Sequence, residues 1–270
     1  MKKIILLIIS VFLAVQTINA QVVLDTNLIT IKWTGTTLPS PYFIQANPRG
    51  TGIEWFAIVD NTTKSNITNY AKNIPSGITY FTPPNSTAPI PFDNIVTTLV
   101  TATNNLFNQA VTFNQPIGSW DVNNVTNMSS MFNQAVTFNQ PIGSWNVTNV
   151  TDMSSMFDNA NAFNQSISSW NVGNVTNMFR LFFNAFAFNQ NIGSWNVSSV
   201  TNMAYMFFYA SSFNQPVGSW NVNNVSNMSY MFYGASTFNQ PIGSWNVSSV
   251  TNMSNMFKSA PVFNQPIGSW

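Results

Sequence analysis

Large apolar residues recur along most of the chain at a constant spacing of 25 positions. Tryptophan holds one place in each period, and phenylalanine, always followed by Asn-Gln, holds another. The tryptophans are Trp120, Trp145, Trp170, Trp195, Trp220, Trp245 and Trp270, and the phenylalanines are Phe113, Phe138, Phe163, Phe188, Phe213, Phe238 and Phe263. Six full units cover residues 113–262, with partial units on either side. Such self-similarity indicates a repeat architecture.

Two shorter hydrophobic patterns lie inside each unit. Around Trp220 and Val222 apolar and polar residues alternate, which predicts a short parallel strand. Thr201 offers an N-cap hydroxyl, and the apolar residues behind it follow at helical spacing, which predicts a short helix. One unit has too few apolar groups to offset the entropy lost on ordering it, so successive units must pack on each other. The pattern predicts an α/β solenoid over residues 93–270.

Residues 21–92 do not share the repeat. The stretch Leu28–Thr34 alternates apolar and polar residues and predicts a strand, and Ile53–Val59 is a second apolar run. A β-rich cap for the exposed end of the solenoid is one interpretation of this module, and an independent binding domain is the other. The chain stops at Trp270 in the middle of a unit, which suggests a fragment of a longer protein.

The first twenty residues have the pattern of a secretory signal peptide. Lys2 and Lys3 precede the apolar run Ile4–Val15, which is too short for a bilayer span. With residues 1–20 removed, we expect no transmembrane segment in the mature chain. No cysteine follows Ala20, so the pattern for a lipid anchor is absent and the mode of surface attachment stays open. The sequence predicts a secreted or cell-surface protein.

Composition narrows the choice of function. Only 6% of the residues are charged, and the chain has no cysteine and no histidine. Thiolate chemistry, disulfides and histidine general bases are therefore excluded. Removal of Lys2 and Lys3 with the signal peptide leaves six basic and seven acidic residues, a near-neutral balance that disfavours nucleic acid as a partner. The repeats contain three acids, Asp121, Asp152 and Asp158, in no metal-binding pattern. We predict neither an enzyme nor a metal or cofactor site.

Candidate binding residues are found where the units differ. Positions that point outward from the predicted helix are small and polar in the first two units but aromatic or basic in units three to five. These residues are Arg180, Phe183, Tyr205, Phe208, Tyr209, Tyr230 and Tyr233, flanked by Phe179 and Phe186. Stacked units would merge them into one exposed apolar patch, which is typical of a contact surface. In the alternative interpretation the rings fold down and fill grooves between helices.

Three uniform columns each allow two interpretations. The tryptophans form either a core column or a platform for sugars. Their regular alternation with valine favours the core column. The threonines at 126, 151, 176, 201 and 251 form helix caps or an ice-binding row. The asparagine columns that begin at Asn114 and Asn127 satisfy backbone groups of turns or bind a ligand. The structural interpretation is favoured for all three.

The run FNQPIGSWNVSSVTNMSNMF at 238–257 resembles the BspA-type leucine-rich-repeat surface proteins, a group that includes mycoplasma lipoproteins. The resemblance extends over roughly 100–270 and brings no catalytic motif. It implies right-handed, leucine-rich-repeat-like coils, surface display and adhesion to a protein or glycan at a cell surface or in a matrix. The alternative function is a structural spacer or surface-layer rod that acts through its N-terminal module or through a region beyond Trp270.

Overall fold

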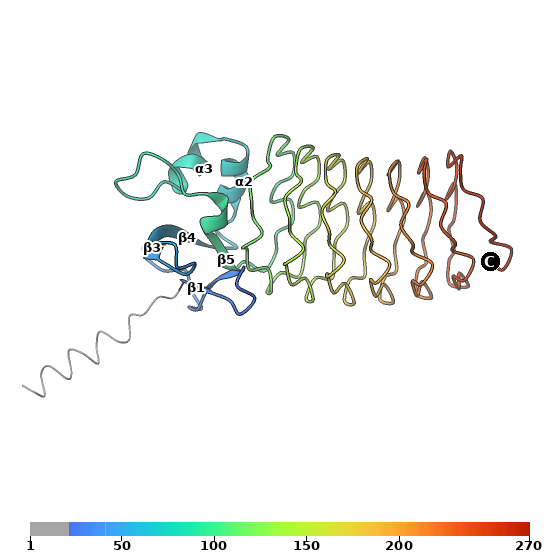
Figure 1. The fold of residues 1–270 in the computed structure, drawn as a ribbon, viewed down its shortest axis with the longest axis horizontal. Helices are drawn as coiled ribbons and strands as arrows, with labels where there is room; N and C mark the ends of the chain where they lie inside the picture. The colour runs from blue at the N-terminus through green and yellow to red at the C-terminus, as the bar shows by residue number, and fades with distance from the viewer. Residues whose placement is uncertain (1–21, 41) are drawn as a thin grey trace, which may run out of the picture.

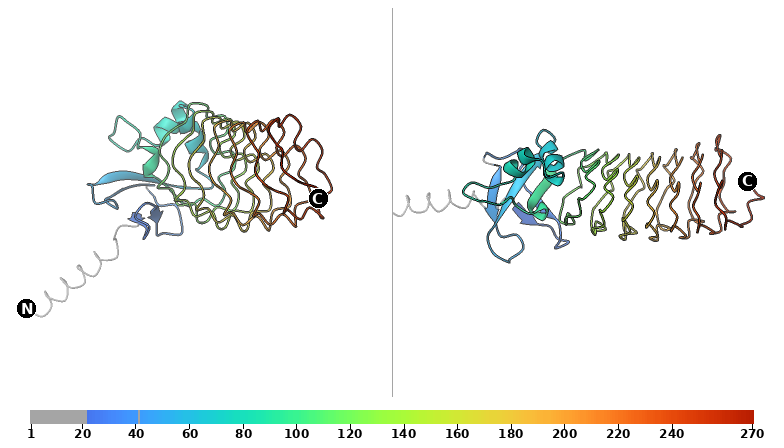
Figure 2. Two further views of the ribbon diagram at one scale, coloured as in Figure 1. Left: turned by 45° about the vertical axis from the view of Figure 1, so that its right-hand side comes forward. Right: turned by 90° about the horizontal axis from the view of Figure 1, so that it is seen from above.

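The computed structural model describes residues 22–40 and 42–270, so the predicted signal peptide at 1–20 lies outside the described residues. The chain forms an N-terminal module of short strands and helices, followed by a row of similar coils stacked side by side (Figures 1 and 2). The module lies at one end of the row and the C-terminus at the other.

Two small sheets form the centre of the module. Strand β1 (Val22–Leu24) pairs antiparallel with β2 (Ile31–Trp33). In the second sheet β3 (Phe43–Ala46) pairs antiparallel with β4 (Glu54–Asp60), and β4 pairs in parallel with β5 (Ile95–Leu99). The parallel pair needs a crossover connection, which the residues between β4 and β5 provide.

The crossover contains helices that the sequence analysis did not predict. These are α2 (Ser65–Ala71), α3 (Pro75–Tyr80) and the 3-10 turn η1 (Phe92–Asn94). Both α-helices are short. Helix α2 is rich in Asn, Ser and Thr, and α3 contains Ser, Gly and Thr, residues of weak helix propensity, so no helical pattern stands out in the sequence. Proline at the first position of α3 fits the helix start, because its missing N–H has no partner there.

The predicted strands correspond to β2 and β4 with shifted ends. On β2 the side chains of Ile31 and Trp33 are buried, whereas Ile29 lies in the preceding turn and is 49% exposed. Four consecutive residues of β4 are buried, which explains why its apolar run does not alternate. Strand β5 belongs to the module although it lies within the stretch 93–270 that we assigned to the repeats.

Backbone and side-chain hydrogen bonds join the module to the first coil. The amide of Ile31 donates to the carbonyl of Ser119 at 2.8 Å, and Ile31 forms a parallel bridge with Trp120. The indole Nε1 of Trp120 donates to the carbonyl of Phe92 at 2.9 Å. The module thus provides partners for the end of the first coil, as a cap would.

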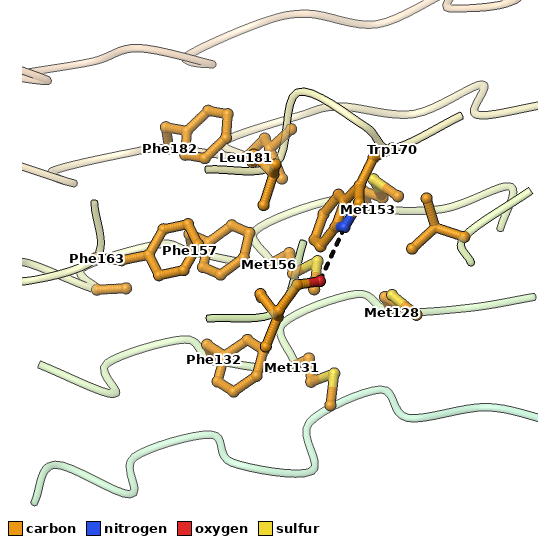
Figure 3. Close-up of a cluster of buried hydrophobic side chains, with 14 of the residues drawn as sticks. Met128, Met131, Phe132, Met153, Met156, Phe157, Phe163, Trp170, Leu181 and Phe182 are labelled. Carbon is orange, nitrogen blue, oxygen red and sulfur yellow. Dashed lines mark hydrogen bonds between the residues drawn. The ribbon is translucent and has the colours of Figure 1, made fainter. Parts of the chain in front are cut away.

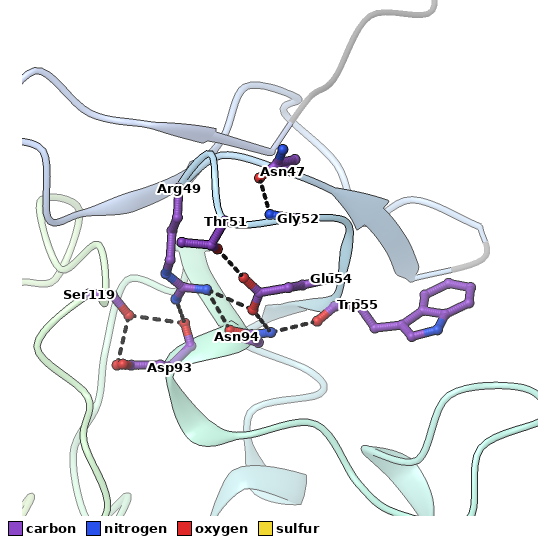
Figure 4. Close-up of polar contacts among 9 residues, drawn as sticks. All are labelled: Asn47, Arg49, Thr51, Gly52, Glu54, Trp55, Asp93, Asn94 and Ser119. Carbon is purple, nitrogen blue, oxygen red and sulfur yellow. Dashed lines mark hydrogen bonds and ion pairs between the residues drawn. The ribbon is translucent and has the colours of Figure 1, made fainter.

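A polar cluster around Arg49 reinforces this contact (Figure 4). The guanidinium donates to Glu54 Oε2 at 3.1 Å, to Asn94 Oδ1 at 2.8 Å and to the carbonyl of Asp93 at 3.0 Å. Asp93 in turn accepts a hydrogen bond from Ser119 Oγ at 3.0 Å. This chain of contacts ties the β3–β4 connection to the first coil.

Each coil is joined to the next by backbone hydrogen bonds at a spacing of one repeat. The amide of Thr151 donates to the carbonyl of Thr126, and that of Met128 donates to Asp152, both at 2.9 Å. Single-residue parallel bridges run along the same line through Ala102, Asn127, Asp152, Asn177, Asn202, Asn227 and Asn252. Equivalent residues of neighbouring coils therefore lie next to each other.

The segment predicted as a helix in each unit is a series of turns. Two residues per coil adopt left-handed backbone angles, as at Ser130 (φ 54°) and Gln134 (φ 59°). Between them the amides alternate: Met131 donates within the coil to Met128, whereas Phe132 donates across to Met156. Half of the amides thus bond to the next coil, which replaces the i−4 hydrogen bonds of a helix. The predicted strand around Trp220 is likewise absent, and the inter-coil bridge lies at the asparagine column instead.

Columns of aromatic rings fill the interior of the coils (Figure 3). The rings of Phe132 and Phe157 stack at 5.5 Å with an interplanar angle of 3°, and those of Phe157 and Phe182 at 5.6 Å with 2°. From Trp120 to Trp245 every repeat tryptophan is at most 3% exposed. Indole Nε1 of Trp170 donates to the carbonyl of Ile142 in the preceding coil at 3.1 Å. The core interpretation of the tryptophan column is confirmed.

The asparagine columns satisfy backbone amides, as the structural interpretation predicted. Asn139 Oδ1 accepts hydrogen bonds from the amide of Asn164 and from Nε2 of Gln165 in the next coil, both at 3.0 Å. The same contact recurs from coil to coil, for example between Asn114 Oδ1 and the amide of Asn139 at 2.9 Å. The column is a ladder of side-chain acceptors along the stack.

Replacing Asn139 by alanine should lower the free energy of unfolding by about 1–2 kcal/mol, because two donors lose their acceptor. Urea denaturation followed by tryptophan fluorescence measures this loss. Asn139→Asp is the matched control, since a carboxylate retains an acceptor oxygen in that place. Equal losses in the two variants would contradict the role assigned to the side-chain oxygen.

Candidate functional site

The structure brings the seven predicted binding residues together on coils three to five. We call this set the aromatic face: Arg180, Phe183, Tyr205, Phe208, Tyr209, Tyr230 and Tyr233. Each of the seven contacts at least one other member through a ring or the guanidinium. The period of 25 residues is the cause, because it places the members at three nearby positions of successive coils.

The rings form two columns along the stack. In one, Tyr205 and Tyr230 stack at 4.7 Å with an interplanar angle of 3°. In the other, Phe208 stacks on Phe183 at 4.5 Å and on Tyr233 at 4.8 Å. The faces of these rings are turned toward each other, so the columns present ring edges outward.

The exposure of the aromatic face lies between the two predicted alternatives, an exposed apolar patch and rings folded down into grooves. Within it only Tyr209, at 42%, ranks among the exposed large apolar side chains, and the six others are half-buried. The rings neither stand free in solvent nor sink into the core. They cover one another along the stack and stay partly exposed, which suits contact with a second surface.

Arg180 closes one end of the second column. Its Cζ atom lies 3.7 Å from the ring centroid of Phe183, a cation–π contact, and its Nε donates to Asp158 Oδ2 at 2.8 Å. Asp158 occupies the column position one coil before Phe183, and its side chain is 4% exposed. Burial raises the pKa of Asp158, and the hydrogen bond and charge of Arg180 act against this rise.

The size of the side chains at the left-handed positions distinguishes the aromatic face from the rest of the stack. Arg180, Tyr205, Tyr209 and Tyr230 all have left-handed φ angles, between 50° and 58°. The other occupants of these two positions along the stack are small or amide residues, among which glycine and asparagine tolerate that conformation best: Asn105, Gln109, Ser130, Gln134, Ser155, Asn159, Asn184, Gly234, Asn255 and Ser259. Local backbone preference therefore does not explain the large side chains in coils three to five.

Tyr209 differs in orientation from its neighbours. Its ring plane is at 90° to that of Phe208 and at 78° to that of Tyr233, with centroids 4.8 and 5.4 Å apart. The charge that Tyr233 carries when ionised raises the pKa of Tyr209 above its ordinary value. Tyr209 thus adds an uncharged ring of a different orientation beside the columns.

Sequence reasoning missed two partners of this surface. We named Asp158 only as one of three acids in no metal-binding pattern, although it lies one period before Phe183 and thus in the same column. Gly234 was not considered, although it lies one period after Tyr209, in the position where a side chain would meet that ring. Comparing residues across the period rather than within a unit would have identified both.

The remaining candidate columns have structural partners. The hydroxyl of Thr151 donates to the carbonyl of Thr126 at 3.2 Å, and Thr176 repeats this contact with Thr151. These threonines therefore bond to the preceding coil rather than capping a helix. Within residues 22–40 and 42–270, no group of three acidic side chains could hold a metal ion. The same residues contain no helix long and apolar enough to cross a membrane.

Stacked 25-residue coils with a variable outer face define a tandem-repeat protein. More specifically, the chain belongs to the family described as "Mycoplasma protein of unknown function, DUF285", whose model matches residues 79–192 and again 167–270. The two matched ranges together cover all six full units. Neither the curated proteins nor the solved structures contain a match to this chain.

Proposed function

We propose that this protein is a secreted or cell-surface adhesion protein whose aromatic face binds a protein or glycan partner. The observation that carries the proposal is that four large side chains of this face, Arg180, Tyr205, Tyr209 and Tyr230, stand at left-handed backbone positions. Large residues at left-handed positions are unfavourable unless something compensates for them, and such strain concentrates at functional sites. Tyrosine and arginine, which recur on this face, are the residues most enriched in binding hot spots.

Surface display is supported by the signal-like segment at 1–20 and by the resemblance to BspA-type proteins. We propose that the stack is a right-handed, leucine-rich-repeat-like solenoid, in which the uniform columns maintain the coils and the outer positions vary with the ligand. Binding requires no catalytic group, in keeping with a chain that has no cysteine and no histidine.

The test replaces Tyr205 and Tyr230 together by asparagine. Asn255 has the same place and a left-handed φ of 55°, so asparagine is compatible with this backbone. We expect binding to immobilised extracellular-matrix proteins and to cell layers to fall by about tenfold or more, as for a hot-spot pair. The circular-dichroism spectrum and the urea midpoint should change little.

Leu28→Asn is the matched control. Leu28 is also left-handed (φ 59°) and is 77% exposed, but it lies in the N-terminal module. This variant should bind as the wild type does. Unchanged binding by the Tyr205→Asn/Tyr230→Asn variant would reject the aromatic face as the site and favour the spacer interpretation.

A further inference from the structure

Tyr209 has a ring face that no other aromatic ring stacks on. Both of its ring contacts, with Phe208 and Tyr233, are of the edge type. Each ring of the two columns uses at least one face on another ring, and the guanidinium of Arg180 covers Phe183, whereas Tyr209 stacks on no ring. As the member of the aromatic face with no stacked ring partner and the largest exposure, Tyr209 is the residue best suited to stack on a flat ligand.

Gly234 makes room for this ring. A Cβ atom on Gly234 would lie 2.4 Å from both Cδ1 and Cε1 of Tyr209, a distance that real contacts do not reach. The ring therefore lies against the Gly234 backbone, where every other coil has a side chain: Gln109, Gln134, Asn159, Asn184 and Ser259. The ring thus has the Gly234 backbone on one side, and 42% of the residue is exposed to solvent.

The residues directly beside Tyr209 carry no charge, and Lys258 lies one coil beyond Gly234. Its neighbours in the same column position are Asn184 and Gly234, and the Tyr233 hydroxyl lies beside it. Nδ2 of Asn184 donates to Asn159 Oδ1 at 2.9 Å, which leaves the amide oxygen of Asn184 as an acceptor. The charge of Arg180 is paired with Asp158. A ligand that matches this site is neutral, has a flat apolar face and carries hydroxyl groups at its rim.

We propose that Tyr209 is a stacking platform for a pyranose ring of a neutral glycan. The C–H groups on one face of a pyranose are weakly positive and suit the negative face of an aromatic ring. Its hydroxyls would reach the amide oxygen of Asn184 and the hydroxyl of Tyr233 at the rim. This inference rests on the proposed binding function and selects the glycan among its two partner classes.

The first experiment measures binding to an array of immobilised neutral oligosaccharides of glucose, galactose, mannose and N-acetylglucosamine. Tyr209→Asn should weaken binding by about tenfold, because it removes the platform. Gly234→Asn should do the same while keeping the tyrosine, since its side chain takes the place of the ring. Asparagine stands at this position in two other coils with φ near that of Gly234, so folding should persist. Tyr209→Phe and Leu28→Asn should bind as the wild type does.

A second arm separates this inference from the proposed function. A layer of matrix glycoprotein is used before and after periodate treatment, which destroys sugar rings that carry vicinal hydroxyls. Binding that survives periodate but is lost in Tyr205→Asn/Tyr230→Asn would overturn the glycan inference and leave the aromatic face as a protein-binding site. Binding to sialylated or sulfated glycans alone, or to no glycan on the array, would also overturn it. Loss on periodate treatment and in Tyr209→Asn supports it.

Discussion

Replacing Phe157 by alanine is expected to lower the free energy of unfolding by about 3–5 kcal/mol, the range found for buried phenylalanines. Phe157 is fully buried, and its ring lies 5.5 Å from Phe132, 5.6 Å from Phe182 and 4.0 Å from Phe163. Truncation removes contacts with the coils on both sides and leaves a cavity. Urea denaturation followed by tryptophan fluorescence measures the loss.

Phe257 provides the matched control for this prediction. It has the same place in the repeat and stacks on Phe232 at 5.7 Å, but it is only partly buried. Phe257→Ala should therefore cost clearly less than Phe157→Ala, since less apolar area leaves water when this ring packs. Equal losses at the two positions would mean that burial between two neighbouring coils is not the source of stability.

Replacing Arg180 by alanine is expected to lower the free energy of unfolding by about 2–3 kcal/mol at neutral pH, because a buried carboxylate loses its charged partner. Nε of Arg180 lies 2.8 Å from Oδ2 of Asp158, whose side chain is 4% exposed. The variant also loses the cation–π contact with Phe183. Thermal and urea unfolding of the purified chain measure the change.

The loss in Arg180→Ala should depend on pH in a defined direction. Burial raises the pKa of Asp158 above its ordinary value of 3.8, and removing Arg180 raises it further. The folded state then holds the proton to a higher pH than the unfolded state does, so stability falls as pH rises from 3.8 through the folded pKa. The deficit of the variant should be full at neutral pH and shrink toward pH 4. A deficit independent of pH would contradict the assignment to Asp158.

A double variant separates the ion pair from the rest of the site. The variant combines Asp158→Asn with Arg180→Ser. Each new residue is the one found 25 positions earlier in the sequence, Asn133 and Ser155 respectively. This variant should recover most of the stability lost in Arg180→Ala and lose its pH dependence. Failure to recover would indicate that the contact of Arg180 with Phe183 dominates the effect.

The spacing of the tryptophans and phenylalanines was sufficient to predict which residues face the core. The structure of the segment between them was not predictable in the same way. Apolar residues three and four apart fit a helix, but Ser130 and Gln134 adopt left-handed angles and their amides bond to the next coil. A pattern within one unit contains no information about hydrogen bonds between units. For the same reason the short helices α2 and α3, whose buried partners lie in other segments, were missed.

The membership of the aromatic face was predictable because differences among copies stand out against a uniform repeat. Its geometry was not, since it depends on how rings of successive coils share space. The sequence does not show that Phe183 and Phe208 stack face to face while Tyr209 turns across Gly234. That arrangement determines which ring can stack on a ligand.

Disulfide cross-linking tests most directly the claim that equivalent residues of successive coils lie side by side. The chain has no cysteine, so any introduced pair is unambiguous. Asn177 and Asn202 form a parallel bridge, where neighbouring strands lie about 4.8 Å apart. Asn177 and Asn227 are two coils apart, about 10 Å by the same spacing, and beyond the roughly 7 Å that a disulfide spans. We predict that Asn177→Cys/Asn202→Cys forms an intramolecular disulfide under mild oxidation and that Asn177→Cys/Asn227→Cys does not. Cross-linking of the second pair but not the first would contradict the stacked register on which the aromatic face depends.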